Sequence, residues 1–331
     1  MRNLALITAV VSAVMLGTTF TSCDRVEQAF PPAIKLDTLL YTGATGNTWQ
    51  DYIDNEWPDF DTIAVSLDRN ALIEDFTGHN CSNCPVAADD AHTAHENNPE
   101  RVFVASIHSS NWGASPFQDV NLPAGYTVDF TNTEGLDLGY YFGQTATPPT
   151  SASIGFQGNP SGTVSRRVDN GLLFYPSGQW NTKALETISS PLQVSIQAHV
   201  NYYESVKGLY LHTAVDVIDA SLEPEQLGVV AYLIEDSLVA PQNVSSTLTT
   251  DYVHRDIMRG TLSGLYLGRD LLSGSLIGGK YHLDYSYNVP DLLAPDGEPT
   301  TYNAENMHLL IFVYDKIEHI IYQVIKKKIY Q

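Results

Sequence analysis

Apolar and polar residues follow two different patterns in the two halves of the chain. Between residues 60 and 190, short apolar runs suited to strands are separated by segments with helical spacing of apolar residues. The predicted strands are 63–67, 71–76, 101–107, 151–156 and 162–168, and the predicted helices are 85–97, 133–142 and 180–190. Strands that alternate with helices and then form a hairpin indicate a mixed sheet flanked by helices.

After Pro191 the pattern predicts strands alone. Apolar and polar residues alternate over strand lengths in 192–202, 209–217, 227–234, 281–289, 307–314 and 320–329. Segments 236–251 and 260–279 lack this alternation, and we expect loops or irregular edges there. Repeated short strands favour an immunoglobulin-like antiparallel β-sandwich. The predicted fold class is therefore α/β followed by all-β.

The most specific chemical signal is the C-x-x-C pair Cys81 and Cys84, between a predicted strand and a predicted helix. Pro85 suits the first turn of a helix, where no amide hydrogen bond is lost. The free amides at the start of this helix favour a thiolate at the first cysteine. The arrangement is typical of a thiol–disulfide exchange site, and the alternative is an inert disulfide that only fixes the helix.

Histidines near the cysteines raise the question of a zinc site. His79, His92 and His95 lie close to the pair in sequence. A Cys2His2 site requires about three to five residues between its histidines, whereas two residues separate His92 from His95. We therefore expect no metal and no bound cofactor, and we expect His92 and His95 to face solvent.

The first residues are expected to be an export leader. Arg2 precedes an apolar segment, 4–20, that is too short and too early for a membrane span. The small residues before Cys23 match a bacterial lipobox, which predicts a signal peptide over 1–22 and a lipid on Cys23 as a membrane anchor. An ordinary signal peptide is the alternative. The acidic segment 23–59 is then expected to be a tether.

The charge of the chain excludes one class of partner. The formal net charge is −21, whereas nucleic-acid binding depends on Lys and Arg that neutralise phosphates. The one cationic run, Lys326 to Lys328, falls inside a predicted strand and is expected to be a solvated edge. We therefore expect no nucleic-acid partner.

The segment DFTGHNCSNCP, followed much later by TPPT before a predicted strand, resembles the active site of the thioredoxin fold. In this interpretation Cys81, expected to be the more exposed cysteine, attacks, and Cys84 resolves the mixed disulfide. The resemblance implies that Asp75 is the buried acid behind the dithiol and accepts a proton from Cys84 through a water. A surface carboxylate is the alternative for Asp75.

The same resemblance implies a client-binding loop opposite the dithiol. Pro149 would form the cis peptide bond, and backbone groups of Pro148 and Pro149 would pair with an extended client. We place Thr150 and His79 with the substrate-binding residues, and a charged His79 would also lower the pKa of the Cys81 thiol.

Over nearly its whole length the chain resembles the Bacteroidetes lipoproteins related to the outer membrane protein of 28 kilodaltons. The resemblance rests on the leader, EDFTGHNCSNCP, the long aromatic insert of 109–133 and YVHRDIMRG. It implies an outer membrane lipoprotein of the cell envelope, on the periplasmic or the surface face. The expected divisions are a signal peptide (1–22), a tether (23–59), a thioredoxin-like domain (60–190) and an immunoglobulin-like sandwich (191–331).

Two functions fit these observations. The first is thiol–disulfide exchange on exported proteins, with their thiols or disulfides and a separate redox protein as partners. The second is a surface binding or adhesion lipoprotein in which Cys81 and Cys84 only fix the helix. The 19 tyrosines of the chain, several of them in expected loops, suit a recognition surface.

Overall fold

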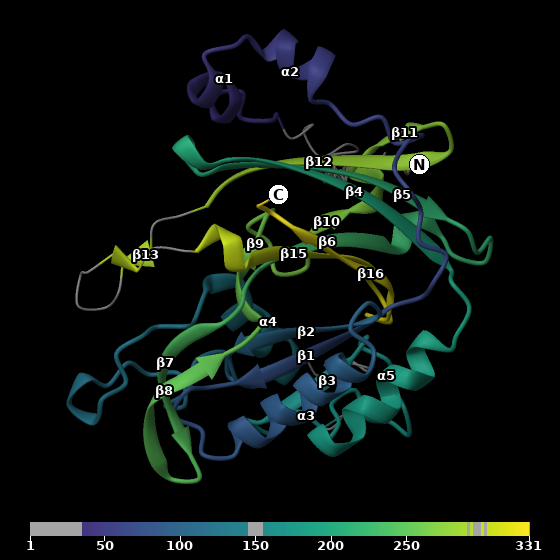
Figure 1. Cartoon of the computed structure of the whole chain (residues 1–331). Helices are drawn as coiled ribbons and strands as arrows, with labels where there is room; N and C mark the ends of the chain where they lie inside the picture. The colour runs from purple at the N-terminus through teal and green to yellow at the C-terminus, as the bar shows by residue number, and fades with distance from the viewer. Residues whose placement is uncertain (1–34, 145–154, 290–291, 294–298, 301–302, 331) are drawn as a thin grey trace, which may run out of the picture. The chain divides into compact units, whose positions relative to one another are not determined.

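A mixed eight-stranded sheet, the largest sheet of the described residues, is the centre of the fold (Figure 1). The computed structural model describes residues 35–144, 155–289, 292–293, 299–300 and 303–330. The strands in order are β16 (Ile321–Lys328), β15 (Met307–Asp315), β6 (Leu227–Glu235), β9 (Ile257–Thr261), β2 (Val102–His108), β1 (Ala71–Thr77) and β3 (Ser161–Val164), with β10 (Arg269–Asp270) beside β6.

Strands from both halves of the sequence meet in this sheet. β1 runs parallel to β2 and antiparallel to β3, whereas β6 is antiparallel to β9 and β15. The two groups join where Ser106 of β2 pairs with Ile257 of β9. The main sheet therefore continues across residue 190, where the sequence pattern changes.

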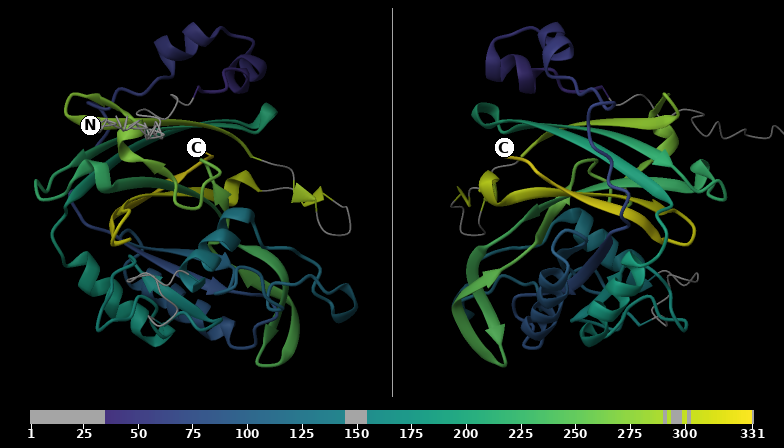
Figure 2. Two further views of the ribbon diagram at one scale, coloured as in Figure 1. Left: turned by 180° about the vertical axis from the view of Figure 1, so that it is seen from behind. Right: turned by 45° about the vertical axis from the view of Figure 1, so that its right-hand side comes forward.

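A second, antiparallel sheet packs on the main sheet (Figure 2). Its order is β11 (Ser275–Ile277), β12 (Lys280–Asn288), β5 (Gly208–Val217) and β4 (Val194–Tyr203). Apolar side chains of this sheet, such as Leu211 and Leu283, share one core with Val229 and Leu309 of the main sheet. The architecture is thus mixed α/β together with a further β layer.

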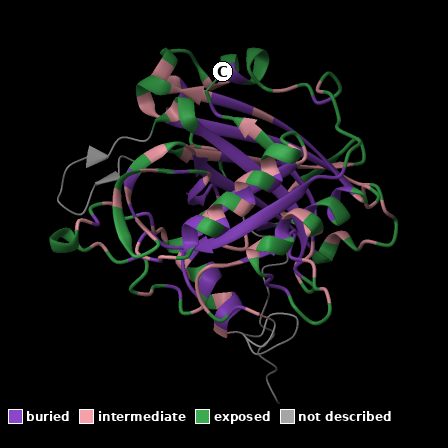
Figure 3. Ribbon diagram, turned by 60° about the horizontal axis from the view of Figure 1, so that its bottom comes forward, coloured by how far each residue is buried: buried purple, intermediate pink, exposed green. Residues whose placement is uncertain are grey.

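Helices cover the other part of the main sheet. α3 (Cys84–Asn97) and α5 (Trp180–Ile188) pack on one face of β1, β2 and β3, and α4 (Thr133–Gln144) lies on the opposite face. Ala87, Ala91 and Ala94 recur on the buried side of α3, so the helix approaches the sheet closely. Helices and strands thus bury β1 on both sides, as the buried central strands in Figure 3 show.

Several predicted elements differ from the structure. The expected strand at 63–67 is absent, and residues 151–154 of another lie outside the described residues. The expected tether contains α1 (Leu39–Thr45) and α2 (Trp49–Asn55), because Tyr52 packs on the second sheet and its hydroxyl lies 2.7 Å from Nε2 of His212. The expected loop 236–251 contains most of the hairpin of β7 (Leu238–Val244) and β8 (Thr247–His254).

The remaining elements are short. They are η1 (Leu122–Ala124), η3 (Ser177–Gln179), η4 (Glu204–Val206), η5 (Pro224–Gln226), η6 (Leu271–Ser273), η7 (Ala304–Asn306), β13 (Leu292–Leu293) and β14 (Pro299–Thr300). The larger elements that the sequence pattern predicts, such as α3 and α5, have boundaries close to those expected.

Candidate functional site

Strand β1 positions the candidate site because it leads directly into the dithiol loop. The chain leaves β1 at Thr77, and α3 begins at Cys84 with Pro85 in its first turn. Cys81 lies in the intervening turn, where its amide donates a hydrogen bond to the carbonyl of Gly78 at 3.1 Å. Both cysteines therefore lie at the start of a helix, where free amides stabilise a thiolate.

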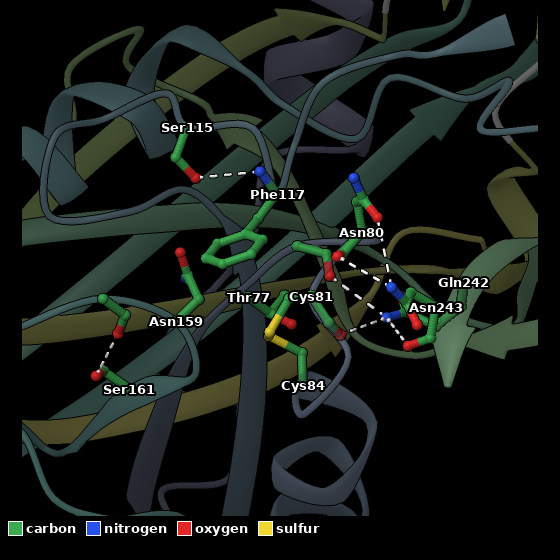
Figure 4. The surroundings of a disulfide bond; sticks show 12 residues. Thr77, Asn80, Cys81, Cys84, Ser115, Phe117, Asn159, Ser161, Gln242 and Asn243 are labelled. Carbon is green, nitrogen blue, oxygen red and sulfur yellow. Dashed lines mark hydrogen bonds between the residues drawn. A yellow bond between two sulfur atoms is a disulfide. The ribbon is translucent and has the colours of Figure 1, made fainter. Parts of the chain in front are cut away.

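Cys81 and Cys84 form a disulfide, and their Cα atoms are 5.4 Å apart (Figure 4). Only 2% of Cys81 and 1% of Cys84 is exposed. Both cysteines are thus almost completely buried, and Cys81, expected to be the more exposed one, differs little from Cys84. The physical reason is that two segments distant in sequence, the aromatic insert near Phe117 and the β7–β8 hairpin near Gln242, lie around the bond.

The aromatic insert contacts the loop that precedes the dithiol. The side-chain amide of Gln118 donates to the carbonyl of Thr77 at 2.7 Å, and the amide of Asn80 donates to the carbonyl of Phe117 at 3.0 Å. A Cβ at Gly78 would lie 2.6 Å from the Phe117 carbonyl oxygen, so this close approach requires glycine. The insert thus forms one wall of the site.

The β7–β8 hairpin forms another wall, which the sequence did not reveal. The side-chain amide of Gln242 donates to the carbonyl of Cys81 at 3.2 Å, and the backbone amide of Asn243 donates to the carbonyl of His79 at 2.8 Å. Both residues follow a three-residue apolar run, 238–240, that ends at Pro241. The run is too short for a strand prediction, and a proline after it argues against a strand.

Asp75 is buried behind the disulfide. Its residue is 1% exposed, and neither carboxyl oxygen has a hydrogen-bond partner among the described residues. Burial raises the pKa of Asp75 from its ordinary value of 3.8 to about 8. The alternative of a surface carboxylate is thereby excluded, and the group changes its protonation close to neutral pH.

Asp75 and Cys84 line the same small cavity. The cavity has a volume of about 40 Å³, and His108, Gln242 and His254 are also among its lining residues. This volume is enough for a water molecule, which needs polar partners such as the free carboxyl oxygens of Asp75. Asp75 and Cys84 thus border one space that can hold a water molecule.

The neighbouring carboxylate, Glu74, has a different environment. Its two oxygens accept hydrogen bonds from Arg166 at 2.7 and 2.8 Å, and Tyr232 and Thr163 donate to it at 2.8 and 2.9 Å. Burial would raise the pKa of Glu74, but the Arg166 charge and these hydrogen bonds outweigh it and hold the pKa below its ordinary value. Glu74 is thus a paired structural charge.

His79 is also buried, with 1% of the residue exposed. Its Nε2 lies 2.8 Å from the carbonyl oxygen of Asp119, and its ring stacks on Tyr126 with 5.2 Å between the centroids. Burial lowers the pKa of His79 below its ordinary value of 6.5, so the ring is mainly neutral at pH 7. The insert covers the ring, so the condition for His79 to lower the pKa of the Cys81 thiol, a charged imidazole, is not favoured.

The predicted client-binding loop lies outside the described residues, so the structure gives no account of Pro148, Pro149 and Thr150. The described part of the chain has its cis peptide bond at Asn159–Pro160, directly before β3. Asn159 lies near the disulfide in Figure 4, and its side-chain amide donates to the carbonyl of Ser109 at 2.7 Å. The sequence predicts a turn there but not its place at the site.

The described residues contain no group of His, Cys, Asp and Glu suited to a metal ion. His92 lies 3.0 Å from Glu96 through its Nε2, and Nδ1 of His95 lies 2.6 Å from the Val102 carbonyl oxygen. In the same part of the chain, none of the helices is both long and apolar enough to span a membrane.

A comparison with models of known protein families identifies the family of this chain. The family model described as outer membrane protein Omp28 matches residues 149–331, more than half of the chain. The chain belongs to the Omp28 family of outer membrane proteins. The match begins after the dithiol, so family membership says nothing about the chemistry of Cys81 and Cys84.

Two solved structures from Porphyromonas gingivalis are similar to the chain. HBP35 is 18% identical, with a TM-score of 0.56 over 80% of this chain and 76% of that one, and this likeness shows the fold alone. A domain of the outer membrane lipoprotein Omp28 is 21% identical, with a TM-score of 0.29 over 41% of this chain and 88% of that one. No curated protein matches the sequence.

Proposed function

We propose that the protein is an envelope-anchored, thioredoxin-like lipoprotein that performs thiol–disulfide exchange on exported proteins through Cys81 and Cys84. The observation that carries this proposal is the unpaired carboxyl of Asp75, which shares a cavity with Cys84. A buried carboxyl without a partner destabilises a fold, and a disulfide with a structural role alone does not need one.

The arrangement of elements supports the thioredoxin-like assignment for residues 60–190. β1 lies between parallel β2 and antiparallel β3, the dithiol joins β1 to α3, and α3 and α5 share one face. For residues 191–331, the two sheets that share a core support an immunoglobulin-like sandwich. The signal peptide and the lipid on Cys23 lie outside the described residues, and the leader sequence and the Omp28 match support them.

The exchange reaction balances between the protein and its client. The Cys81 thiolate attacks a client disulfide, which forms a mixed disulfide and releases one client thiolate. The Cys84 thiolate then attacks the sulfur of Cys81, which releases the second client thiolate and leaves the Cys81–Cys84 disulfide. Two electrons pass to the client, and the same steps run in reverse when a client dithiol is oxidised. A separate redox protein restores the starting state.

In this mechanism Asp75 moves the proton of Cys84. Its carboxylate accepts the Cys84 proton through the cavity water, and the acid form returns a proton when the thiol is regenerated. A pKa of about 8 suits both directions near neutral pH, since an acid–base catalyst works best when its pKa is close to the working pH. Asp75 therefore controls when Cys84 becomes a nucleophile.

Clients are proposed to bind as extended segments beside the dithiol loop. Backbone groups of Pro148 and Pro149, with Thr150 and His79 nearby, form the proposed binding edge. The clients are thiols or disulfides of exported proteins, and the net charge of −21 disfavours nucleic acid.

Trapping tests the proposal directly. In a Cys84→Ala variant the mixed disulfide on Cys81 is not resolved, so client proteins are expected to remain attached and to appear on non-reducing gels of the cell envelope. The matched control is Cys81→Ala combined with Cys84→Ala, which has no attacking thiol. Equal absence of adducts in both variants would contradict thiol–disulfide exchange.

A second function is favoured by one observation, the nearly complete burial of both cysteines. In that alternative the protein is a binding or adhesion lipoprotein, and the disulfide only fixes the start of α3. It predicts that replacing both cysteines by serine lowers stability but leaves binding of the protein to its surface partner intact.

A further inference from the structure

The β7–β8 hairpin is a separate two-stranded sheet that reaches the dithiol loop from the second half of the chain (Figures 1 and 2). Its turn, Ser245 and Ser246, has positive φ at both residues, 49° and 68°, as a tight hairpin turn requires. No strand of the main sheet pairs with β7 or β8 in the described residues. At its base, Leu238 and Ala240 pack in one apolar cluster with Ile257 of β9.

The inner edge of the hairpin pairs with the dithiol loop through its backbone. The amide of Asn243 donates to the carbonyl of His79 at 2.8 Å, and the amide of Ser245 donates to the carbonyl of Ser82 at 3.1 Å. Ser245 is the first residue of the turn, so this backbone contact runs from the end of β7 into the turn.

Side chains complete the contact with the loop. The amide of Gln242 donates to the carbonyls of Cys81 and Gly78 at 3.2 and 3.4 Å, and the side-chain amide of Asn243 donates to the carbonyl of Asn80 at 3.4 Å. The loop carbonyls on both sides of Cys81 are thus occupied by a segment of the same chain. Figure 4 shows Gln242 and Asn243 beside the disulfide.

The tip of the hairpin also meets the aromatic insert. A Cβ at Gly125 would lie 2.6 Å from Cδ2 of Leu248, so the insert and the hairpin are in close contact there. Together the two segments account for the 2% exposure of Cys81. The hairpin thus blocks the approach of another thiol or disulfide to Cys81, which an exchange reaction requires.

The hairpin has features of an element that opens separately from the core. Val239, Leu248 and Val253 are exposed by 61%, 39% and 39%, so much of its surface is already in water. At its base, Ser237 and Asp256 have positive φ, 61° and 49°, and flank the two strands. Elements with few buried apolar contacts open at a lower free energy than core strands.

We propose that the β7–β8 hairpin is an intramolecular cover that closes the dithiol loop and must lift before the disulfide reacts. The regulatory part of this inference rests on the proposed function, because a client has to reach Cys81 at the loop that the hairpin covers. The hairpin and the client then exclude each other, and reactivity depends on how often the hairpin opens.

The rate of reduction of the Cys81–Cys84 disulfide in the oxidised full chain tests the cover. The reductant is tris(2-carboxyethyl)phosphine at fixed pH, and the products are alkylated and weighed by mass spectrometry. Replacement of residues 241–251 by Gly-Gly joins Ala240 to Tyr252, which are paired across the hairpin. We expect reduction to be at least about tenfold faster than in the wild type, since several hydrogen bonds no longer hold the cover.

A matched pair of point variants isolates the backbone contact. Asn243→Pro removes the amide that donates to His79, and Asn243→Ala keeps that amide but loses the side chain. We expect a faster reduction for Asn243→Pro, by about threefold or more over Asn243→Ala. Unchanged rates, within about twofold, in both the tip replacement and Asn243→Pro would overturn the proposal.

Hydrogen exchange of the wild-type chain gives an independent result that needs no variant to fold. The amides of Asn243 and Ser245 are expected to exchange much faster than those of β1, because the hairpin opens without global unfolding. Equal protection of these amides and the β1 amides would overturn the cover. The reduction and hydrogen-exchange measurements require no client protein. A failure of the proposed exchange function would appear separately, as an absence of trapped clients even when Cys84→Ala is combined with the tip replacement.

Discussion

The two faces of β1 place adjacent carboxyl groups in opposite situations. Glu74 points to the side of Arg166 and Tyr232, where every charge has a partner at hydrogen-bond distance. Asp75 points to the cavity beside Cys84, where its oxygens have no partner among the described residues. Both residues are almost completely buried, so burial does not explain the difference.

The difference lies in pairing. Arg166 and the hydrogen bonds around Glu74 lower the pKa of that carboxyl, whereas burial without compensation raises the pKa of Asp75 to about 8. A buried charge that is fully paired serves the structure, and a buried acid that titrates near pH 7 suits proton transfer. On one face of β1 the buried carboxyl of Glu74 thus stabilises the fold, and on the other face the buried carboxyl of Asp75 suits proton transfer.

Arg166→Met is expected to have the largest effect on stability. It leaves Glu74 buried without its counter-charge, so the free energy of unfolding should fall by about 3–5 kcal/mol. Urea denaturation measures this loss, and Arg166→Met combined with Glu74→Gln should recover part of it. A loss below about 1 kcal/mol in the single variant would show that the pair does not hold the Glu74 face of the strand.

Asp75→Asn is expected to change how stability depends on pH. The folded pKa of Asp75, about 8, lies above the unfolded value near 3.8, so the folded state keeps a proton that the unfolded state loses between these values. This contribution to stability is fully present below pH 4 and is lost as pH rises towards 8. The variant should therefore gain a few kcal/mol over the wild type at pH 8 and almost nothing at pH 4.

Urea denaturation of both oxidised proteins at pH 4, 6 and 8 measures that difference. A constant difference across this range would contradict the raised pKa of Asp75. The matched control is Glu74→Gln, which should lower stability at pH 6 and 8, because it removes a paired charge and leaves Arg166 uncompensated.

Tyr232→Phe is expected to have the smallest effect. The hydroxyl donates to Glu74 at 2.8 Å and accepts a hydrogen bond from Arg166 at 2.9 Å, so its loss should lower the free energy of unfolding by about 1–2 kcal/mol. Thermal unfolding at pH 7 measures it. The same substitution should leave the reduction rate of the disulfide unchanged, and a change in that rate would mean that the two faces are coupled.

Much of the dithiol region could be predicted because its signals are local. The apolar run of β1, the proline in the first turn of α3 and the spacing of Ala87, Ala91 and Ala94 each specify the structure of a few neighbouring residues. The position of Asp75 came from a resemblance to a known site rather than from the pattern. Its burial required the helices and strands that pack around β1.

The rest depended on contacts between distant segments. Ser106 pairs with Ile257 across about half of the sequence, and no local pattern encodes that pairing. The sequence pattern does not predict the β7–β8 hairpin, because Pro241 interrupts β7 and polar residues on both faces of β8 remove the alternation that identifies a half-buried strand. The sequence pattern does not predict helix α2, because its stability comes from aromatic packing of Tyr52 on Tyr210.

The same limit applies to the burial of Cys81. The start of a helix predicts an accessible thiol, but accessibility is decided by segments such as the insert and the hairpin, which reach the site from elsewhere in the chain. The sequence therefore indicates the chemistry on the Asp75 side of β1, but it does not indicate whether other molecules can reach the disulfide there.

The reduction potential of the Cys81–Cys84 disulfide tests the central claim most directly. The full chain is equilibrated with mixtures of reduced and oxidised dithiothreitol and glutathione, and the thiol fraction is measured by alkylation. A disulfide that exchanges with clients should have a potential of about −120 to −270 mV, the range of known exchange proteins. A potential below about −300 mV, where inert structural disulfides lie, would contradict the account.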